Sequence, residues 1–407
     1  MSRWRRIIGI TLFLIIAAVI GFIIYYFFFR PIIAPRPPGV APPTVGLPPS
    51  GVAVPGLPPA AVAPPAPAVP GAPPSPVAAG GLTLAKTLLP SVSRYVQLAR
   101  DGQSMYYYDQ ATGQYFKIDP TTGGSVPLSD KTFPEVQNTS WSPAGEAKAI
   151  IEFPDNRKIF FDFNKQEQVT LPSHWQEFNW SPKGNEVVTK SIGVSETNRF
   201  LVVTNPDGSN ARAVESLGRN ADKVDLSYSP NGDMIAFSRT GEAQEFGKQE
   251  IIPVGKNREN FRSFVVEGFG FESQWTPDGS KILYSVAGER TDWKPALWTI
   301  AGRGDGIGGE RKFIGLQTWA GKCGMAGPTV AYCAAPRELQ TGAGFSRAVA
   351  NETPDDIYRV ELDTGKYRLV AAPTEAAAIS KIIVSADGSA LYYTELLSGA
   401  LKQIKLR

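Results

Sequence analysis

The sequence predicts an all-β protein, a β-propeller of seven four-stranded blades, preceded by one transmembrane α-helix and a disordered proline-rich linker. Three observations lead to this prediction. A turn motif recurs at steps of 39 to 48 residues in the C-terminal part of the chain. A stretch of 23 residues near the N-terminus carries no charge. Between these two regions, 18 of the residues 31–80 are proline.

The composition argues against several classes of protein. A length of 407 residues allows two or three domains. A single histidine, His174, and only two cysteines disfavour a histidine-based metal site, a Ser-His-Asp triad and a cysteine-rich zinc module. Residues 1–80 hold five arginines and no acid, whereas the remainder holds 36 basic and 38 acidic residues. The folded part therefore lacks the positive excess that nucleic-acid binding requires, and no nucleic acid or cofactor is predicted.

The uncharged stretch runs from Ile7 to Phe29 and is long enough, at about 35 Å as a helix, to cross a bilayer. A cleavable signal peptide is the alternative, but its apolar region is usually shorter and is followed by small residues. Three arginines precede the stretch, so the positive-inside rule places residues 1–6 in the cytoplasm as a basic tail. The propeller is then extracytoplasmic, in the periplasm or at the cell surface.

Residues 30–80 are rich in proline, alanine, valine and glycine. Proline lacks the backbone donor and has a fixed φ, so this segment is expected to form neither a helix nor an interior strand. An extended spacer of the polyproline type is expected. The alternative is a proline-rich ligand for a recognition domain.

The recurring motif in residues 81–407 consists of an aromatic residue, Ser or Thr, Pro, a small or polar residue, and Gly. The copies are Trp141-Ser142-Pro143-Ala144-Gly145, Trp180-Ser181-Pro182-Lys183-Gly184, Tyr228-Ser229-Pro230-Asn231-Gly232 and Trp275-Thr276-Pro277-Asp278-Gly279. Proline presets φ, the hydroxyl can bond the turn backbone, and glycine accepts a positive φ. An alternating apolar run follows each copy, so each motif is predicted to turn a β-hairpin. Further strand signals complete a four-stranded unit of the size of a propeller blade.

These residues resemble the WD40-like propeller repeat of the TolB type. The resemblance covers about 320 residues and implies a β-propeller that binds partners without catalytic machinery of its own. The chain departs from TolB itself, because the predicted anchor and spacer stand where TolB has a cleaved signal and an α/β domain.

Seven blades are expected, with hairpins near residues 101, 143, 182, 230, 277, 328 and 387. The last unit ends after its third strand, so the alternating run at residues 82–88 is predicted to supply the missing outer strand. The alternative is a ring of six blades, in which one of these units does not form a blade. Trp141, Trp180 and Trp275 share one repeat position and are expected to pack between blades.

No nucleophile elbow and no phosphate-binding loop occur in the sequence. His174 and the pair Asp355-Asp356 are interpreted as loop residues at the surface. The protein is therefore not expected to be an enzyme.

Cys323 and Cys333 lie at equal distances from Pro328 in the sixth hairpin, which would place them opposite each other. Opposed residues of antiparallel strands come close to disulfide geometry, and an extracytoplasmic location permits oxidation. A disulfide is predicted, with two buried free thiols as the alternative.

The connections between second and third strands lengthen in blades three to six, at residues 191–199, 240–248, 287–295 and 334–355. Long loops on a rigid scaffold concentrate binding residues, and aromatic and arginine side chains dominate interfaces. The predicted partner-binding residues are Arg290, Trp293, Arg337, Phe345 and Arg347. The alternative is that these loops are solvent-exposed and bind no partner.

Together these features predict a membrane-tethered module that binds a protein or an envelope polymer. An extracytoplasmic glycan- or peptide-processing enzyme and a structural component of an envelope or secretion assembly are the alternatives.

Overall fold

The computed structural model describes residues 73–407 except 91 and 243. These residues belong to the second of two compact units, Pro64–Arg407. The predicted tail, transmembrane segment and most of the linker lie outside the described residues. Within the described part, no helix has both the length and the apolar character needed to cross a membrane.

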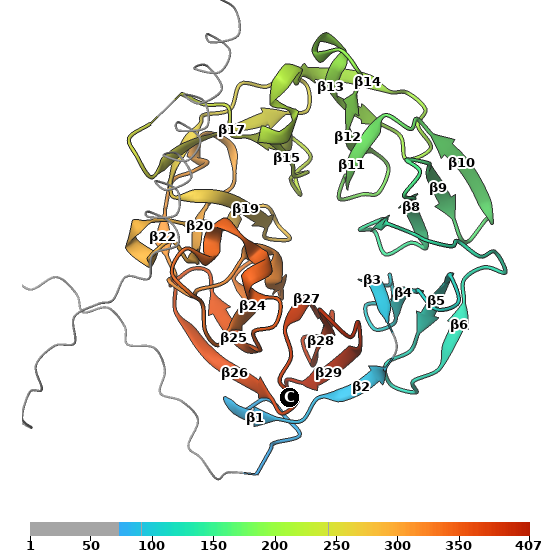
Figure 1. The fold of residues 1–407 in the computed structure, drawn as a ribbon, viewed down its shortest axis with the longest axis vertical. Coiled ribbons are helices and arrows are strands. Elements are labelled where there is room, and N and C mark those ends of the chain that lie inside the picture. Colours follow the sequence, from blue (N-terminus) through green and yellow to red (C-terminus); the bar gives the residue numbers. More distant parts are fainter. Residues whose placement is uncertain (1–72, 91, 243) are drawn as a thin grey trace, which may run out of the picture. The chain divides into compact units, whose positions relative to one another are not determined.

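Seven sheets are arranged around a central axis, and Figure 1 shows them as the blades of a closed ring. Blades 1 to 3 contain β3 (Ser93–Leu98), β4 (Met105–Asp109), β5 (Gln114–Ile118) and β6 (Ser125–Pro127); β7 (Asn138–Trp141), β8 (Lys148–Glu152), β9 (Lys158–Asp162) and β10 (Glu167–Leu171); and β11 (Trp175–Trp180), β12 (Val187–Ile192), β13 (Arg199–Thr204) and β14 (Arg212–Ser216). Blades 4 and 5 contain β15 (Val224–Leu226), β16 (Met234–Ser238), β17 (Lys248–Gly255) and β18 (Phe264–Glu267); and β19 (Phe269–Trp275), β20 (Lys281–Ala287), β21 (Pro295–Ala301) and β22 (Lys312–Phe313).

Blades 6 and 7 are completed by strands from the start of the described chain. Blade 6 contains β23 (Cys323–Met325), β24 (Val330–Pro336), β25 (Asp355–Glu361) and β26 (Tyr367–Pro373), with β1 (Gly81–Thr83) added in parallel to β26. Blade 7 contains β27 (Ile379–Val384), β28 (Ala390–Glu395) and β29 (Leu401–Lys405), with β2 (Lys86–Leu89) as its outermost strand. The prediction of seven blades is confirmed. The missing outer strand comes from residues 86–89, and residues 81–83 extend blade 6 instead.

Within residues 73–407, short 3₁₀ turns connect strands: η2 (Glu196–Asn198), η3 (Gly218–Lys223), η4 (Glu289–Thr291), η5 (Gly304–Gly306), η6 (Ala320–Lys322), η7 (Ala343–Phe345) and η8 (Arg347–Ala350). Contact with the ring begins before residue 81, in residues that the sequence had assigned to the linker. The amide of Ala78 donates to the carbonyl of Lys405, and that of Gly80 donates to the carbonyl of Val370.

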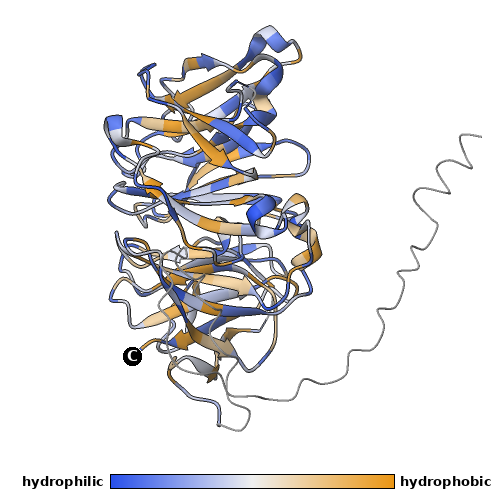
Figure 2. Ribbon diagram, turned by 90° about the vertical axis from the view of Figure 1, so that its left-hand side faces the viewer, coloured by the Kyte–Doolittle hydropathy of each residue, from blue (hydrophilic) through white to orange (hydrophobic). Residues whose placement is uncertain are grey.

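The hydrophobic core is divided among the gaps between blades. Each of seven buried clusters joins side chains of two neighbouring blades, such as Tyr115 of blade 1 with Phe161 of blade 2. Apolar residues accordingly concentrate on the strands, and polar residues cover the loops at both ends of the ring (Figure 2). The ring is stabilised by blade-to-blade packing, so every blade depends on both of its neighbours.

The motif tryptophans lie at these blade boundaries, as predicted. The Nε1 atom of Trp141 in blade 2 donates to the carbonyl of Tyr95 in blade 1. Trp180 of blade 3 donates to the carbonyl of Ser140 in blade 2 at 3.1 Å. Trp275 of blade 5 donates to the hydroxyl of Ser227 in blade 4 at 2.9 Å. At these three boundaries an indole, buried in Trp141 and Trp180 and half-buried in Trp275, packs between two blades while its N–H is satisfied by the neighbouring blade.

Candidate functional site

The connections between second and third strands emerge at one end of the ring, which we call the loop face. They cover residues 193–198, 239–247, 288–294 and 337–354 in blades 3 to 6. In blades 1 and 2 they cover only residues 110–113 and 153–157. The predicted difference in loop length is therefore present in blades 4 to 6, whereas the blade 3 connection exceeds that of blade 2 by a single residue. The long loops of consecutive blades stand next to one another around the ring.

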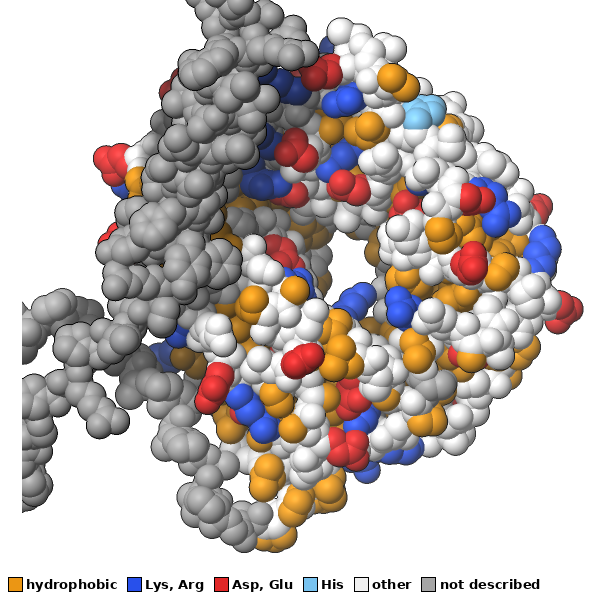
Figure 3. All heavy atoms as spheres, in the orientation of Figure 1, with side chains coloured by type: hydrophobic (Ala, Val, Ile, Leu, Met, Phe, Trp, Pro, Cys, Tyr) orange, Lys and Arg blue, Asp and Glu red, His pale blue; other side chains and the backbone are white. Residues whose placement is uncertain are grey.

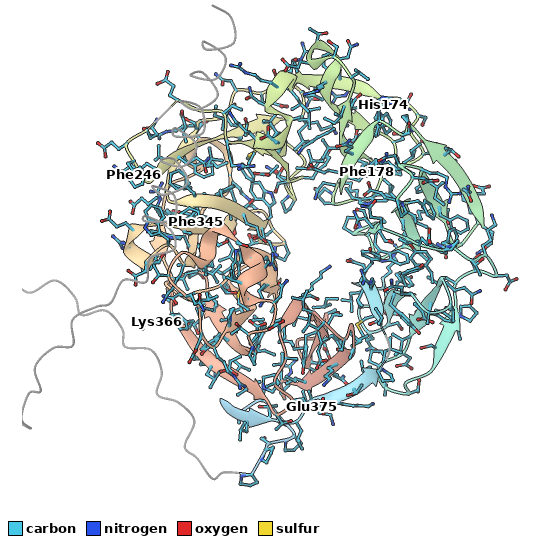
Figure 4. The ribbon with its side chains drawn as sticks, viewed as in Figure 1. His174, Phe178, Phe246, Phe345, Lys366 and Glu375 are labelled. Carbon is cyan, nitrogen blue, oxygen red and sulfur yellow. A yellow bond between two sulfur atoms is a disulfide. The ribbon has the colours of Figure 1, made fainter. Side chains whose placement is uncertain are left out.

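Four aromatic side chains from blades 4, 5 and 6 meet on this face, and we call them the aromatic cluster. They are Phe246, Phe269, Trp293 and Phe345. The ring of Trp293 stacks on Phe345 with centroids 5.5 Å apart and on Phe269 at 6.1 Å. Phe246 contacts the edges of Phe269 at 6.4 Å and Trp293 at 5.8 Å. Phe246 of the blade 4 loop and Phe345 of the blade 6 loop lie on the same side of the ring (Figure 4).

The cluster is unusually open to solvent for aromatic residues. Phe246 is 86% exposed and Phe345 is 66% exposed. Phe246 lines two hollows of about 340 and 400 Å³, of which the first is also lined by Phe269 and the second by Trp293. Contiguous exposed apolar surface on a soluble domain marks an interaction site more often than chance exposure.

The backbone that presents Trp293 adopts a rare conformation. Asp292 and Trp293 both have left-handed φ values, 52° and 58°. Side chains with a Cβ atom rarely occupy this region, and such strain clusters at functional sites. Two amides of the blade 6 loop hold the conformation, because Gly342 donates to the carbonyl of Asp292 and Gly344 donates to that of Trp293, each at 2.9 Å.

Gly344 also explains how the two loops come so close. A Cβ atom at this position would lie 2.1 Å from the Cβ of Ala287 and 2.8 Å from the carbonyl oxygen of Trp293. Only glycine therefore allows the blade 6 loop to press against blade 5. The hydrogen bonds and the close approach fix Phe345 beside Trp293.

The three predicted arginines have other contacts. The guanidinium of Arg290 lies over Phe313, 5.2 Å from the ring centroid. Arg337 forms an ion pair with Asp356 at 2.9 Å. Arg347 lies over Trp319 and is 3.4 Å from Glu272. The structure therefore brings Trp293 and Phe345 together and places the arginines around them in separate local pairs.

Phe246 and Phe269 were missed by sequence reasoning. Phe246 lies in one of the long loops that the sequence had singled out, so an aromatic residue there was a usable signal. Phe269 begins β19 and is flanked by Gly268 and Gly270, both with positive φ. Two glycines around one aromatic residue at a strand start were the only sign of its special position.

The pair Asp355-Asp356 corrects another expectation. Asp355 begins β25 and is only 1% exposed, so it is not a solvated loop residue. Its carboxylate accepts hydrogen bonds from Lys322 Nζ at 2.7 and 2.6 Å and from the amide of Ile379 at 2.6 Å. The spacing of Lys322 and Asp355 in the sequence gives no sign of this ion pair, because β24 and the long loop separate them.

His174 is exposed in the connection between β10 and β11, in agreement with the sequence prediction. Cys323 and Cys333 are register partners in β23 and β24, and their sulfur atoms are joined in the structure. Among the residues that the structure describes, no group of three or more His, Cys, Asp or Glu side chains could hold a metal ion.

An open channel runs along the axis of the ring (Figure 3). Asp225 on the innermost strand of blade 4 is a carboxylate whose pKa is raised by burial, an effect that the Arg239 charge opposes. The Arg239 Nε atom donates to its Oδ2 at 2.9 Å. Asp225 is thus paired with an arginine and not with a second carboxylate, which is the arrangement that glycan hydrolysis uses.

Comparison with solved structures agrees with this architecture. The β-propeller domain of Cps50 (Swd1) from Myceliophteria thermophila matches with a TM-score of 0.53 and 14% identity, over 80% of this chain and 100% of that chain. The RRP9 WD40 repeats match with a TM-score of 0.50 and 12% identity, over 79% of this chain and 97% of that chain. Hydrazine synthase from Kuenenia stuttgartiensis matches with a TM-score of 0.52 and 15% identity, over 79% of this chain and 97% of that chain.

At these identities the likeness shows the fold alone: the chain forms a WD40-like seven-bladed β-propeller. No protein-family model and no curated protein matches the sequence.

Proposed function

We propose that this propeller is a protein-binding module and that the aromatic cluster on the loop face is its contact surface. The conformation of Trp293 carries the proposal. A strained backbone, fixed by hydrogen bonds from the next blade, presents an indole between Phe269 and Phe345. The indole is thus held rigidly beside two exposed phenylalanines, and large, rigid aromatic side chains are of the kind that dominates binding at protein interfaces.

The charge of the loop face supports a protein partner over a nucleic acid. The four long loops together contain five basic and seven acidic residues. Phosphate backbones require a clear positive excess, which these loops lack. An apolar patch with a mixed polar rim is typical of surfaces that bind other proteins.

The tether belongs to the same proposal. Residues 1–6 form a cytoplasmic tail, residues 7–29 cross the membrane, and residues 30–80 carry the propeller away from the bilayer on its outer side. The support comes from the uncharged stretch, the arginines before it and the prolines after it. The TolB-type form of the turn motifs agrees with an extracytoplasmic module that binds a protein or envelope polymer.

A photo-crosslinking side chain placed at position 345 tests the contact surface in intact cells. We expect discrete crosslinked protein species, and we expect Trp293→Ala to reduce their yield at least fivefold. A crosslinker at Val126, an exposed residue of the outermost strand of blade 1, is the matched control. Equal species from both positions, or none at 345, would refute this surface.

Protease added to intact cells, or to spheroplasts where an outer membrane exists, tests the tether. Cleavage within residues 31–80 is expected to release the propeller. Protection in cells with cleavage only in inverted vesicles would place the propeller in the cytoplasm.

A further inference from the structure

A second feature of the loop face lies between blades 6 and 7, where a pocket of about 310 Å³ is lined by Arg347 of the same loop that carries Phe345. Its walls include the apolar side chains of Trp319, Ile379 and Leu396. Two cationic side chains, Lys322 and Arg347, line the same volume. We call this hollow the blade 6–7 pocket.

Lys322 has a hydrogen-bonding donor to spare in this pocket. Its side chain is 5% exposed, and two of its donors are engaged by the two oxygens of Asp355. An ammonium group has three donors. No acceptor for the third one occurs among residues 73–407 outside the two undescribed positions. A buried cation that lines a pocket with an unused donor is suited to an anionic group.

Arg347 is held in place, but most of its donors have no acceptor within the described part of the chain. Its guanidinium lies 5.6 Å from the ring centroid of Trp319, and one nitrogen is 3.4 Å from Glu272 Oε1. Glu272 Oε1 also accepts a hydrogen bond from the amide of Gly321 at 2.7 Å, which fixes the carboxylate. A guanidinium has five donors in a planar fork that matches a carboxylate.

The charges around the pocket disfavour a doubly charged group more strongly than a singly charged one. Asp355 and Glu272 already offset the two cations, so a doubly charged phosphate would meet two nearby carboxylates. Burial lowers the pKa of Lys322; the charge and the hydrogen bonds of Asp355 oppose this shift, and the neighbouring Arg347 charge adds to it. An anion between the two cations would relieve this repulsion. Apolar walls and cations around one volume fit a carboxylate attached to an apolar group.

We propose that the blade 6–7 pocket binds the free C-terminal carboxylate of the partner, together with the apolar side chain of its last residue. In a C-terminal residue the carboxylate and the side chain branch from the same Cα atom. One residue can therefore place its carboxylate near the two cations and its side chain against the apolar walls. This inference rests on the proposed function, because Arg347 and Phe345 belong to the same loop. A partner segment that covers the aromatic cluster would then end in the pocket.

Dipeptide probes test the pocket on the full-length protein in detergent. N-acetyl-Gly-Leu with a free carboxylate should bind at least tenfold more tightly than the same peptide with a C-terminal amide, as measured by ligand-observed NMR titration. N-acetyl-Glu amide, which carries only a side-chain carboxylate, should bind like the leucine amide. Equal binding of the acid and amide forms overturns the proposal, and equal binding of the glutamate probe overturns the C-terminal source.

Variants of the pocket separate recognition from folding. Arg347→Gln should reduce binding of the acid at least fivefold and leave the thermal midpoint unchanged, and Arg347→Lys should retain part of the affinity. Arg303→Gln in the connection between β21 and β22 of blade 5, whose arginine pairs with Asp278, is the matched control and should bind like the wild type. Equal loss in both variants refutes the assignment.

Replacing the buried pair together, as Lys322→Met with Asp355→Asn, should remove the preference for the acid in a folded protein, because both charges are removed and the asparagine oxygen can still accept the hydrogen bond from the amide of Ile379. Retained preference contradicts the role of Lys322. If the acid preference is absent while crosslinking at position 345 persists, only this inference fails. If crosslinking fails while the acid still binds, the proposed function fails instead.

Discussion

In most of the hairpin turns, the hydroxyl of the motif Ser or Thr accepts a hydrogen bond from the backbone amide five residues later. The Oγ of Ser229 accepts a hydrogen bond from the amide of Met234 at 2.9 Å, and Ser385 accepts one from Ala390 at 3.0 Å. Thr276 makes the equivalent bond with Lys281. The predicted role of the motif Ser or Thr is therefore confirmed in these blades. Ser142 of blade 2 differs, because its buried hydroxyl has no partner in the part of the chain that the structure describes.

This difference gives a matched pair of substitutions. Ser385→Ala leaves the amide of Ala390 without its acceptor and should lower the free energy of unfolding by about 1–2 kcal/mol. Ser142→Ala removes a buried hydroxyl without a partner, so it should be neutral or slightly stabilising. Denaturant titration of both variants measures the two values. A larger loss for Ser142→Ala than for Ser385→Ala would contradict the hydrogen-bonding account.

The acid of the same turn should have a measurable titration. Hydrogen bonds from the Ser385 hydroxyl and from the amide and hydroxyl of Ser389 lower the pKa of Asp387 to about 2. Because the folded-state pKa is lowered, the stability contributed by Asp387 is present above about pH 3.9 and is lost as the pH falls toward 2. Carboxyl NMR should show this pKa, and Ser385→Ala should raise it. An unchanged pKa in that variant would assign the shift to other donors.

At the scale of the element, the turns of neighbouring blades interlock through their glycines. Gly145 has φ of 67°, and an added Cβ would lie 2.5 Å from the backbone of Arg100 in the blade 1 turn. The amide of Arg100 donates to the carbonyl of Gly145 at 2.9 Å. Gly232 has the same kind of φ, 86°, but an added Cβ there meets nothing within 4 Å.

Alanine at these two glycines should therefore have unequal effects. Gly232→Ala carries only the left-handed backbone penalty, about 1–2 kcal/mol. Gly145→Ala adds a clash with backbone that cannot move without separating two blades, and it should lower the free energy of unfolding by at least about 3 kcal/mol. Thermal and denaturant unfolding compare the variants directly. Equal losses would mean that the turns of blades 1 and 2 are not rigidly packed.

The elements that could be predicted are those defined by local sequence. Turn proline and glycine with alternating strands fix each hairpin, and seven repeats imply a ring. The same reasoning found Trp293 and Phe345, because loop length and residue type are visible in the chain.

The rest of the site depends on contacts between blades. Phe246 and Phe269 join the cluster only when blades 4 and 5 are side by side. Lys322 and Asp355 become partners only after a long loop folds back. No local pattern encodes the left-handed φ of Trp293 either, because amides of the blade 6 loop impose it.

At the scale of the whole molecule, ring closure depends on β1 and β2. Deleting residues 1–72 should leave a monomeric propeller, whereas deleting residues 1–90 exposes the edges of β26 and β29. It also removes Leu88 and Leu89, which pack between blades 7 and 1 and contribute about 2–3 kcal/mol. The longer deletion should melt at least about 4 °C lower and associate through the free edges, as measured by calorimetry and light scattering. Identical behaviour of both deletions would mean that these strands do not close the ring.

The cysteine pair links the fold to the compartment in which the protein works. Cys323 and Cys333 face each other across the first hairpin of blade 6 and close a loop with a sequence separation of 10. In the chain-entropy description such a crosslink stabilises by about 3 kcal/mol. Cytosolic thiols are kept reduced, so the pair should be oxidised only if the propeller is extracytoplasmic.

Intact mass of the protein from its native membrane, alkylated after unfolding without reductant, should therefore show no alkylated cysteine. Reduction should then lower the thermal midpoint to that of the double variant Cys323→Ser with Cys333→Ser, which serves as the control. Two alkylated thiols in the unreduced protein would contradict the disulfide and remove one argument for the outward topology. A disulfide that formed only after cell lysis would be recognised by trapping the thiols in intact cells first, because the alkylated fraction would then rise.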